Sequence, residues 1–430
     1  MAAQFFSSLA DNALLIAAIA LLSEVSAPDW MTPLLRLCFT ISYIVFAAYV
    51  GIFADSMPKG RVMFLTNMVK VFGCVLMLFG GHPLLSYAIV GLGAAAYSPA
   101  KYGILTEMLP PAKLVVANGW IEGLTVIAII LGVVLGGALI LPAVAAPVLA
   151  LPFMEALGIT THAKAAILVI LFIFGLSAII NLFIPDTGKR YPKSSFEPVK
   201  TLTNFLSSCT MLWKDKLGQT SLSVTSMFWG AGAVLQFLVL AWADKNFGLN
   251  LSQASVLQAV VSLGIAIGAV SAAKFVPLKQ SLKVLPMGVL MGVIVMFAAF
   301  FTRDMLPWNI PLPGGYEISA AIVAAGFIMV LVGALAGYFV VPMNALLQNR
   351  GYVLMSAGRS IAVQNFNENT SMLLMLGVYS LMIKGGLHTS SIMSIFGAFV
   401  ACGMVLVILN HKRHEAKGDL SHMIGEEKKF

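Results

Sequence analysis

Residues 164–185 read KAAILVILFIFGLSAIINLFIP, and the polar stretch Asp186–Gly218 follows them directly. The apolar run carries one charge, at its first position, and is long enough to cross a hydrocarbon core of roughly 30 Å as a helix. The whole chain is 59% hydrophobic and only 10% charged, whereas a soluble domain has about 25% charged residues. The sequence therefore predicts an all-α polytopic membrane protein.

Twelve stretches of this kind are predicted, six on each side of the polar stretch. They cover residues 3–23, 33–54, 61–81, 84–108, 116–141, 164–185, 219–243, 251–276, 281–302, 316–347, 358–384 and 388–410. The first begins almost at Met1, so we expect a retained span rather than a signal peptide. The predicted parts are an N-terminal six-helix half (1–185), a cytoplasmic linker (186–218), a C-terminal six-helix half (219–411) and a cytoplasmic tail (412–430).

Most of the 26 Lys and Arg residues fall in segments that face the cytoplasm if the N-terminus lies inside. The positive-inside rule therefore predicts that both termini are cytoplasmic. Read this way, the net charge of +8 reflects topology and requires no nucleic-acid partner. The four cysteines are far apart, which predicts neither a disulfide nor a metal site. The sequence has no P-loop, GxSxG or HExxH motif, so we expect no ATPase or hydrolase chemistry.

The later part of the linker has a helical pattern. Its apolar residues are spaced by three and four positions and are Val199, Leu202, Leu206, Cys209 and Trp213. Lys200 and Lys214 lie off that apolar stripe. This pattern predicts a helix that rests on the inner membrane surface. Its role is either to join the two halves or to recognise lipid. By contrast, the apolar, Pro-containing segment 141–159 is predicted as an outer loop.

The two halves resemble each other in the positions of proline within their helices. The fourth predicted helix ends around Ala96–Lys101 with Pro99, and the tenth ends around Tyr338–Asn344 with Pro342. A two-half transporter typically has six helices, a basic linker and six further helices, with matching proline positions in the two halves.

Five charges lie well inside the apolar helices: Asp11, Lys70, Lys101, Glu122 and Glu368. Each would cost about 2.5–3.5 kcal/mol if isolated at the bilayer centre. We therefore expect them to pair or to line a wet interior between the halves. Further polar residues accompany them on the same helices, namely Asn12, Tyr97, Asn118, Asn365 and Asn369. The alternative role of all these groups is interhelical hydrogen bonding, and Lys70 has the further option of snorkelling to the membrane surface.

The loop after the second span reads Gly51-Ile-Phe-Ala-Asp55-Ser-Met-Pro-Lys59-Gly60-Arg61. It resembles the Gly-x-x-x-Asp…Gly-Arg/Lys loop of the major facilitator superfamily, which implies a twelve-helix major facilitator fold. The resemblance also implies that Gly51, Asp55, Lys59 and Arg61 act in gating, by holding the cytoplasmic ends of the two halves together. An anion at a helix end also interacts favourably with a neighbouring helix dipole and with Arg61.

Over essentially its whole length the chain resembles the bacterial lysophospholipid transporter family. The blocks that carry this are Leu9–Leu15, Gly91–Leu105, Ala117–Gly119 and Val363–Asn369. The resemblance implies a flippase of the bacterial inner membrane that moves lysophosphatidylethanolamine and lysophosphatidylglycerol from the outer to the inner leaflet. It also implies a separate acyltransferase/acyl-carrier-protein synthetase that reacylates them, and no cofactor.

The hypothesis for the headgroup is that Lys101, with Lys70, attracts the phosphate, while Asp11 and Glu122 meet the amine or hydroxyls. Glu368, Asn365 and Asn369 complete the C-terminal side of the cavity. Where the family resemblance implies a basic residue in the seventh helix, this sequence has Gln236. Two alternatives stay open: a cation- or proton-coupled exporter of amphipathic small molecules, and a non-transporting scaffold for an acyltransferase.

Overall fold

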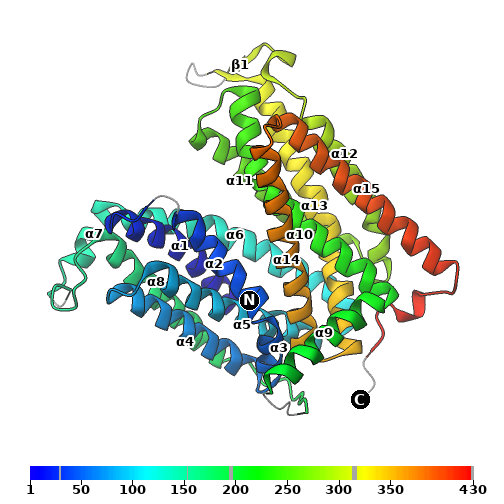
Figure 1. The fold of residues 1–430 in the computed structure, drawn as a ribbon, viewed down its shortest axis with the longest axis horizontal. Coiled ribbons are helices and arrows are strands. Elements are labelled where there is room, and N and C mark those ends of the chain that lie inside the picture. Colours follow the sequence, from blue (N-terminus) through cyan, green and yellow to red (C-terminus); the bar gives the residue numbers. More distant parts are fainter. Residues whose placement is uncertain (29–30, 153, 193–196, 312–316, 428–430) are drawn as a thin grey trace. The chain divides into compact units, whose positions relative to one another are not determined.

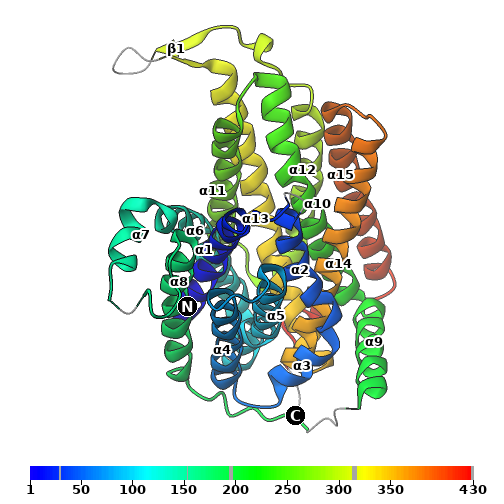
Figure 2. The same ribbon diagram turned by 60° about the vertical axis from the view of Figure 1, so that its left-hand side comes forward.

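The structure is a computed structural model that describes residues 1–28, 31–152, 154–192, 197–311 and 317–427 (Figures 1 and 2). Residues 193–196 of the predicted linker and 428–430 of the predicted tail lie outside the described residues. The described chain is mainly helical. Its two strands, β1 (Asn309–Pro311) and β2 (Glu317–Ser319), form one antiparallel pair with Ile310 opposite Ile318.

Each of the twelve predicted spans contains helix in the described chain, which confirms the all-α polytopic fold, although the tenth (316–347) also includes strand β2. The first six correspond to α1 (Ala2–Glu24), α2 (Met31–Val45) with α3 (Ala47–Asp55), α4 (Lys59–Leu78), α5 (Pro83–Met108), α6 (Leu114–Ile140) and α8 (His162–Leu182). The other six are α10 (Lys216–Phe247), α11 (Leu251–Phe275), α12 (Leu285–Ala298), α13 (Ala320–Leu354), α14 (Ala357–Lys384) and α15 (Thr389–Glu415). Short 3₁₀ turns lie at Pro111–Lys113 (η1), Leu278–Val284 (η2), Arg303–Met305 (η3) and Ser421–Met423 (η4).

Within the described residues, nine helices are long and apolar enough to cross a membrane, and the bent pair α2–α3 makes a tenth. The two parts of that pair meet at an angle of 65°, which the sequence pattern did not predict. The helices α5 and α14 are not among the ten. α5 contains Tyr97, Ser98 and Lys101, and α14 contains Asn365 and Glu368. The polar side chains of these candidate site residues therefore lower the mean hydropathy of both helices.

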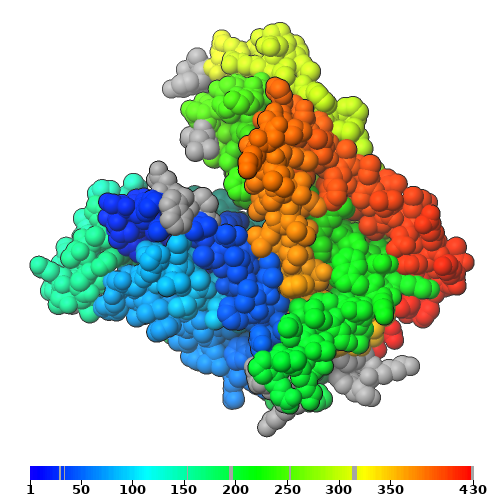
Figure 3. Space-filling view, viewed as in Figure 1, coloured from blue at the N-terminus to red at the C-terminus, as the bar shows by residue number. Residues whose placement is uncertain are grey.

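Two helices lie outside the spans. α7 (Pro142–Leu149) occupies part of segment 141–159, where a loop was expected. Its first residue, Pro142, suits a helix start, where the missing N–H has no intrahelical partner in any case. α9 (Pro198–Lys214) covers the amphipathic stretch of the linker and lies at the surface, in green in Figure 3.

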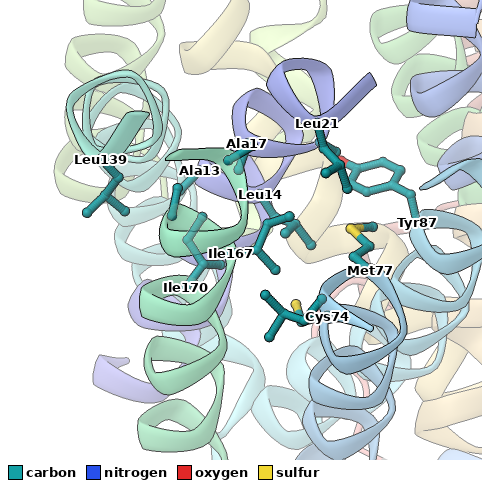
Figure 4. Packing of buried hydrophobic residues seen from close by; sticks show 14 of the residues in the cluster. Ala13, Leu14, Ala17, Leu21, Cys74, Met77, Tyr87, Leu139, Ile167 and Ile170 are labelled. Atoms are coloured by element: carbon teal, nitrogen blue, oxygen red, sulfur yellow. The ribbon is translucent and has the colours of Figure 1, made fainter. Parts of the chain in front are cut away.

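The chain forms two compact units, and each takes a short segment from the other half of the sequence. Unit 1 contains Met1–Leu109, Ile127–Met211 and Leu354–Phe366, and unit 2 contains Pro110–Val126, Leu212–Val353 and Asn367–Phe430. In unit 1, α1 and α4 both pack on α8. Their apolar core includes Leu14 and Ala17 of α1, Cys74 and Met77 of α4, and Ile167 of α8 (Figure 4).

In unit 2, α11 and α13 cross at a pair of small-residue motifs. Gly264 and Gly268 of α11 face Gly333 and Gly337 of α13 so closely that a Cβ on Gly264 would lie 3.1 Å from the Cα of Gly333. A Cβ on Gly333 would collide with the carbonyl oxygen of Val261. In a membrane the hydrophobic effect contributes little to helix association, because lipid tails are themselves apolar. Close backbone contact of this kind is therefore a main source of packing energy.

We therefore predict that Gly333→Ala destabilises the folded protein by about 1–3 kcal/mol, the usual cost of overpacking. Gly232→Ala is the matched control, because a Cβ there meets no atom within 4 Å. It should leave the melting temperature of the detergent-solubilised protein unchanged or higher, since Ala favours helix over Gly. Equal melting temperatures for the two variants would contradict the close α11–α13 crossing.

Candidate functional site

A buried ion pair joins α1 to α4. The Lys70 ammonium lies 2.8 Å from each carboxylate oxygen of Asp11. The Lys70 side chain is 1% exposed and that of Asp11 19% exposed, so Asp11 is the more exposed member of the pair. Pairing offsets the cost that each charge would have alone in hydrocarbon. The structure thus brings together two of the five predicted intramembrane charges.

A chain of hydrogen bonds extends from this pair to α8. Lys70 donates to Ser7 Oγ (3.0 Å), and Ser7 Oγ donates to Asn67 Oδ1 (3.0 Å). Asn67 Nδ2 then donates to Ser177 Oγ (2.9 Å), which donates to the carbonyl oxygen of Ala3 (2.7 Å). Sequence analysis did not identify Ser7, Asn67 or Ser177. A usable signal was the spacing of Asn67 and Lys70, which places both side chains on one face of α4.

Two aromatic rings complete the surroundings of Lys70. Its ammonium lies 5.1 Å from the centre of the Tyr97 ring and 5.3 Å from that of Phe174. Both distances are within the range in which a cation is attracted to a ring face. The predicted site residue Tyr97 therefore lies beside the Asp11–Lys70 pair. One turn further along α5, the Lys101 ammonium lies 4.5 Å from the centre of the Tyr102 ring.

Two contacts connect residues of the two sequence halves inside a compact unit. In unit 1, Asn365 Nδ2 of α14 donates to Ser98 Oγ of α5 at 2.9 Å. In unit 2, Asn118 of α6 and Gln348 of α13 exchange two amide hydrogen bonds of 2.9 Å each. The predicted residue Asn365 therefore lies next to the Tyr97–Lys101 block, and Asn118 is held by a partner that the sequence pattern did not indicate.

The other predicted residues differ in exposure. Glu122 on α6 and Glu368 on α14 are buried, and Asn369 is half-buried. Asn12 is half-buried and donates to the carbonyl oxygen of Ser8 one turn earlier. Gln236 on α10 is exposed. Over the part of the chain that the structure describes, no group of three or more His, Cys, Asp or Glu side chains is placed to hold a metal ion.

The predicted gating residue Asp55 caps the first turn of α14. Its carboxylate accepts hydrogen bonds from the backbone N–H groups of Gly358 (2.9 Å) and Arg359 (3.2 Å). These N–H groups have no partner within the helix, and the helix dipole favours a negative charge at this end. The approach needs glycine on both sides, since a Cβ on Gly358 would lie 2.7 Å from Asp55 Oδ1, and one on Gly51 would lie 2.9 Å from the Cβ of Ala362.

The ion-pair partner of Asp55 is Lys59, at 2.7 Å, whereas Arg61 is exposed. The buried Lys59 ammonium also lies 3.2 Å from Glu107 at the end of α5. Glu107 in turn accepts hydrogen bonds from Thr187 (2.7 Å) and Tyr191 (2.9 Å), which follow α8. One buried lysine therefore links the loop motif to the end of α5.

Unit 2 also has a buried cation, near the end of α13. Arg350 binds Asp215 at 2.6 Å and Glu426 of the C-terminal segment at 2.8 Å. Asp215 also accepts from the N–H of Gly218 and so caps α10. The adjacent Asn349 donates to the carbonyl oxygen of Glu426. Sequence analysis missed this cluster, because its members lie 76 and 135 positions apart.

Comparisons with known proteins agree with this geometry. A family model described as Major Facilitator Superfamily matches residues 1–374. The lysophospholipid transporter LplT of Enterobacter sp. (strain 638) is 41% identical over 400 residues, which cover 93% of this chain and 91% of that protein. The LplT protein of Yersinia enterocolitica serotype O:8 / biotype 1B is 41% identical over 90% of this chain and 87% of its own length.

Solved structures of transporters have the same fold. A variant of the E. coli fucose:proton symporter FucP aligns with a TM-score of 0.68 at 13% identity and covers 96% of this chain and 97% of that one. The human organic anion transporter MFSD10 (TETRAN) aligns with a TM-score of 0.65 at 13% identity, over 95% and 98% of the two chains. At this identity the likeness concerns the fold alone.

Proposed function

Because the chain belongs to the major facilitator superfamily, and within it to the family of bacterial lysophospholipid transporters, we propose that it moves lysophosphatidylethanolamine and lysophosphatidylglycerol from the outer to the inner leaflet. Family membership identifies the chain as a secondary transporter rather than an enzyme, and as a multi-pass protein of the bacterial inner membrane. The direction of movement and the identity of the headgroups are part of what we propose.

One observation supports a headgroup site in unit 1: of the ion pair, the Asp11 side chain is partly exposed and the Lys70 side chain is not. Asp11 is 19% exposed, whereas Lys70 is 1% exposed and already bonded to Asp11 and Ser7. A carboxylate has about four acceptor positions, so Asp11 can accept a further hydrogen bond from a headgroup amine or hydroxyl. Lys70 then acts as a positioning residue that holds Asp11, instead of a phosphate ligand.

Lys101 provides the cation for the phosphate. A lysophospholipid headgroup carries a phosphate beside its amine or hydroxyls, so its site needs both a carboxylate and a cation. Lys101 is half-buried on α5, the helix whose Tyr97 ring contacts the Lys70 ammonium. Of the other predicted residues, Asn12 lies next to Asp11, and Asn365 bonds to Ser98 beside Tyr97.

The remaining predicted residues belong to unit 2, and their part in headgroup binding stays a prediction; they are Asn118, Glu122, Gln236, Glu368 and Asn369. Glu122 and Glu368 are buried acidic residues on α6 and α14. In this proposal the acyl chain stays in apolar surroundings. A separate acyltransferase/acyl-carrier-protein synthetase consumes the flipped lysolipid.

The proposal predicts that spheroplasts making this protein take up labelled lysophosphatidylethanolamine, and that Lys101→Ala removes the uptake without loss of folded protein. Lys101→Arg, which keeps the charge, should retain part of it. An exporter of amphipathic small molecules would instead raise drug resistance and leave lysolipid uptake at the background level. Equal uptake by wild type and Lys101→Ala would contradict the assigned role of Lys101.

A further inference from the structure

α9 has three distinct faces along its length. At 100° per residue, Thr201, Phe205, Ser208 and Leu212 share one face, and all four are buried. A second face, roughly 120° around the helix, carries Val199, Leu202, Leu206 and Trp213. The third carries Thr203, Ser207 and Lys214, which are exposed.

The second face is apolar and uncovered. Val199 is 80% exposed, Leu202 51%, and Leu206 52%. We call Val199, Leu202, Leu206 and Trp213 the apolar row of α9. The row runs the length of a 17-residue helix that is not among the candidate spans of the described chain. A continuous row of large apolar side chains in water is unfavourable and marks an interaction surface.

Two side-chain contacts fix the rotation of α9 about its axis. In unit 1 the Phe205 ring packs edge-to-face on Phe366 of α14, with the ring centres 5.4 Å apart. In unit 2 the Trp213 indole N–H donates to Asn367 Oδ1 at 3.0 Å. Phe205 lies at the middle of α9 and Trp213 near its C-terminal end. A rotation of α9 that turned its apolar row inward would therefore break both contacts.

We infer that the apolar row of α9 is inserted into the acyl-chain boundary of the bilayer, with the exposed Lys200 and Lys214 at the level of the lipid phosphates. The arrangement places protein, lipid and water on three successive faces, as expected for a helix that lies in the membrane interface. Lys and Arg near an anionic leaflet are attracted to it, which makes anionic phospholipid the favoured partner. A protein partner for this face would instead leave the row shielded from lipid.

Site-directed fluorescence quenching tests this inference without reference to transport, so its outcome is independent of the proposed function. The full-length protein, with its four native cysteines replaced by Ala, receives one bimane-labelled Cys at Leu202 or Leu206. The matched controls carry the label at Thr203 or Ser207, which are exposed on the third face of the same helix. Each protein is reconstituted into phosphatidylethanolamine/phosphatidylglycerol vesicles with either acyl-chain-brominated lipid or aqueous iodide.

Labels at 202 and 206 should lose most of their fluorescence to brominated lipid and little to iodide, with the reverse at 203 and 207. A second measurement keeps the native cysteines: the difference between wild type and Trp213→Phe isolates Trp213 fluorescence, which should also be quenched by brominated lipid. Iodide quenching at 206 equal to that at 207 would overturn the inference. Protection of 206 from both quenchers would also overturn it, because a protein surface, such as a second copy of the chain, would then cover the row.

Discussion

Asp11→Asn should reduce lysophospholipid transport by at least about thirtyfold. The substitution removes the carboxylate that we assign to the headgroup and leaves the Lys70 ammonium buried without its charge partner. Truncating one member of a buried charge pair costs about 2–5 kcal/mol. The measurement is the initial rate of labelled lysophosphatidylethanolamine uptake, normalised to folded protein from size-exclusion chromatography.

A double variant separates the loss of folding from the loss of binding. Asp11→Asn with Lys70→Met removes both charges, so the unpaired ammonium no longer destabilises the fold. We expect the double variant to melt at a higher temperature than Asp11→Asn alone and still to be inactive. Recovery of transport in the double variant would mean that the Asp11–Lys70 pair is structural and does not contact the headgroup.

Asp55→Asn should be the second most damaging substitution, with a reduction in transport of about tenfold or more. An Asn still caps a helix, but it gives no charge to the α14 terminus and none to the buried Lys59. The Lys59 ammonium then keeps Glu107 as its ion-pair partner and the carbonyl oxygen of Ala54 as an acceptor. Hydrogen bonds to charged groups contribute about 1.5–3 kcal/mol. The start of α14 should therefore detach from α3 more often.

The detachment can be measured at Ser360, which is 2% exposed in the first turns of α14. In a cysteine-free background, Ser360→Cys should react slowly with a water-soluble maleimide, and Asp55→Asn should accelerate the reaction. Ser56→Ala is the control, since the exposed Ser56 hydroxyl donates to the carbonyl oxygen of Phe53 three positions earlier in the same helix end. Unchanged labelling in Asp55→Asn would contradict the role of Asp55 as the cap of α14.

The spans were predictable because the requirement for them is local. Each helix must satisfy its own backbone groups and present apolar side chains to lipid, so about 20 consecutive residues contain the signal. Tertiary packing determines the bend between α2 and α3 and the short helix α7. The residue pattern did not predict either of them. The helices α5 and α14 were found from sequence although their polar residues keep them out of a strict apolar test.

The charged residues of the site were predictable from the sequence, but the side chains with which they pair were not. Scarcity of charge singled out Asp11 and Lys70, because each is expensive in lipid unless paired. That they pair with each other required the fold, since α1 and α4 are separated by 59 positions at this contact. The same holds for Asn67 and Ser177, which are ordinary polar residues until α4 and α8 bring them together.

The central claim is that this chain alone carries lysophospholipid across a bilayer through a site that contains Asp11. Its most direct test is leaflet-resolved movement of labelled lysophosphatidylethanolamine in liposomes that contain only the purified protein. We predict movement by the wild type well above that of protein-free liposomes, and background movement by the Asp11→Asn, Lys70→Met variant at equal folded protein. Background movement by well-folded wild type, or equal movement by both proteins, would contradict the claim.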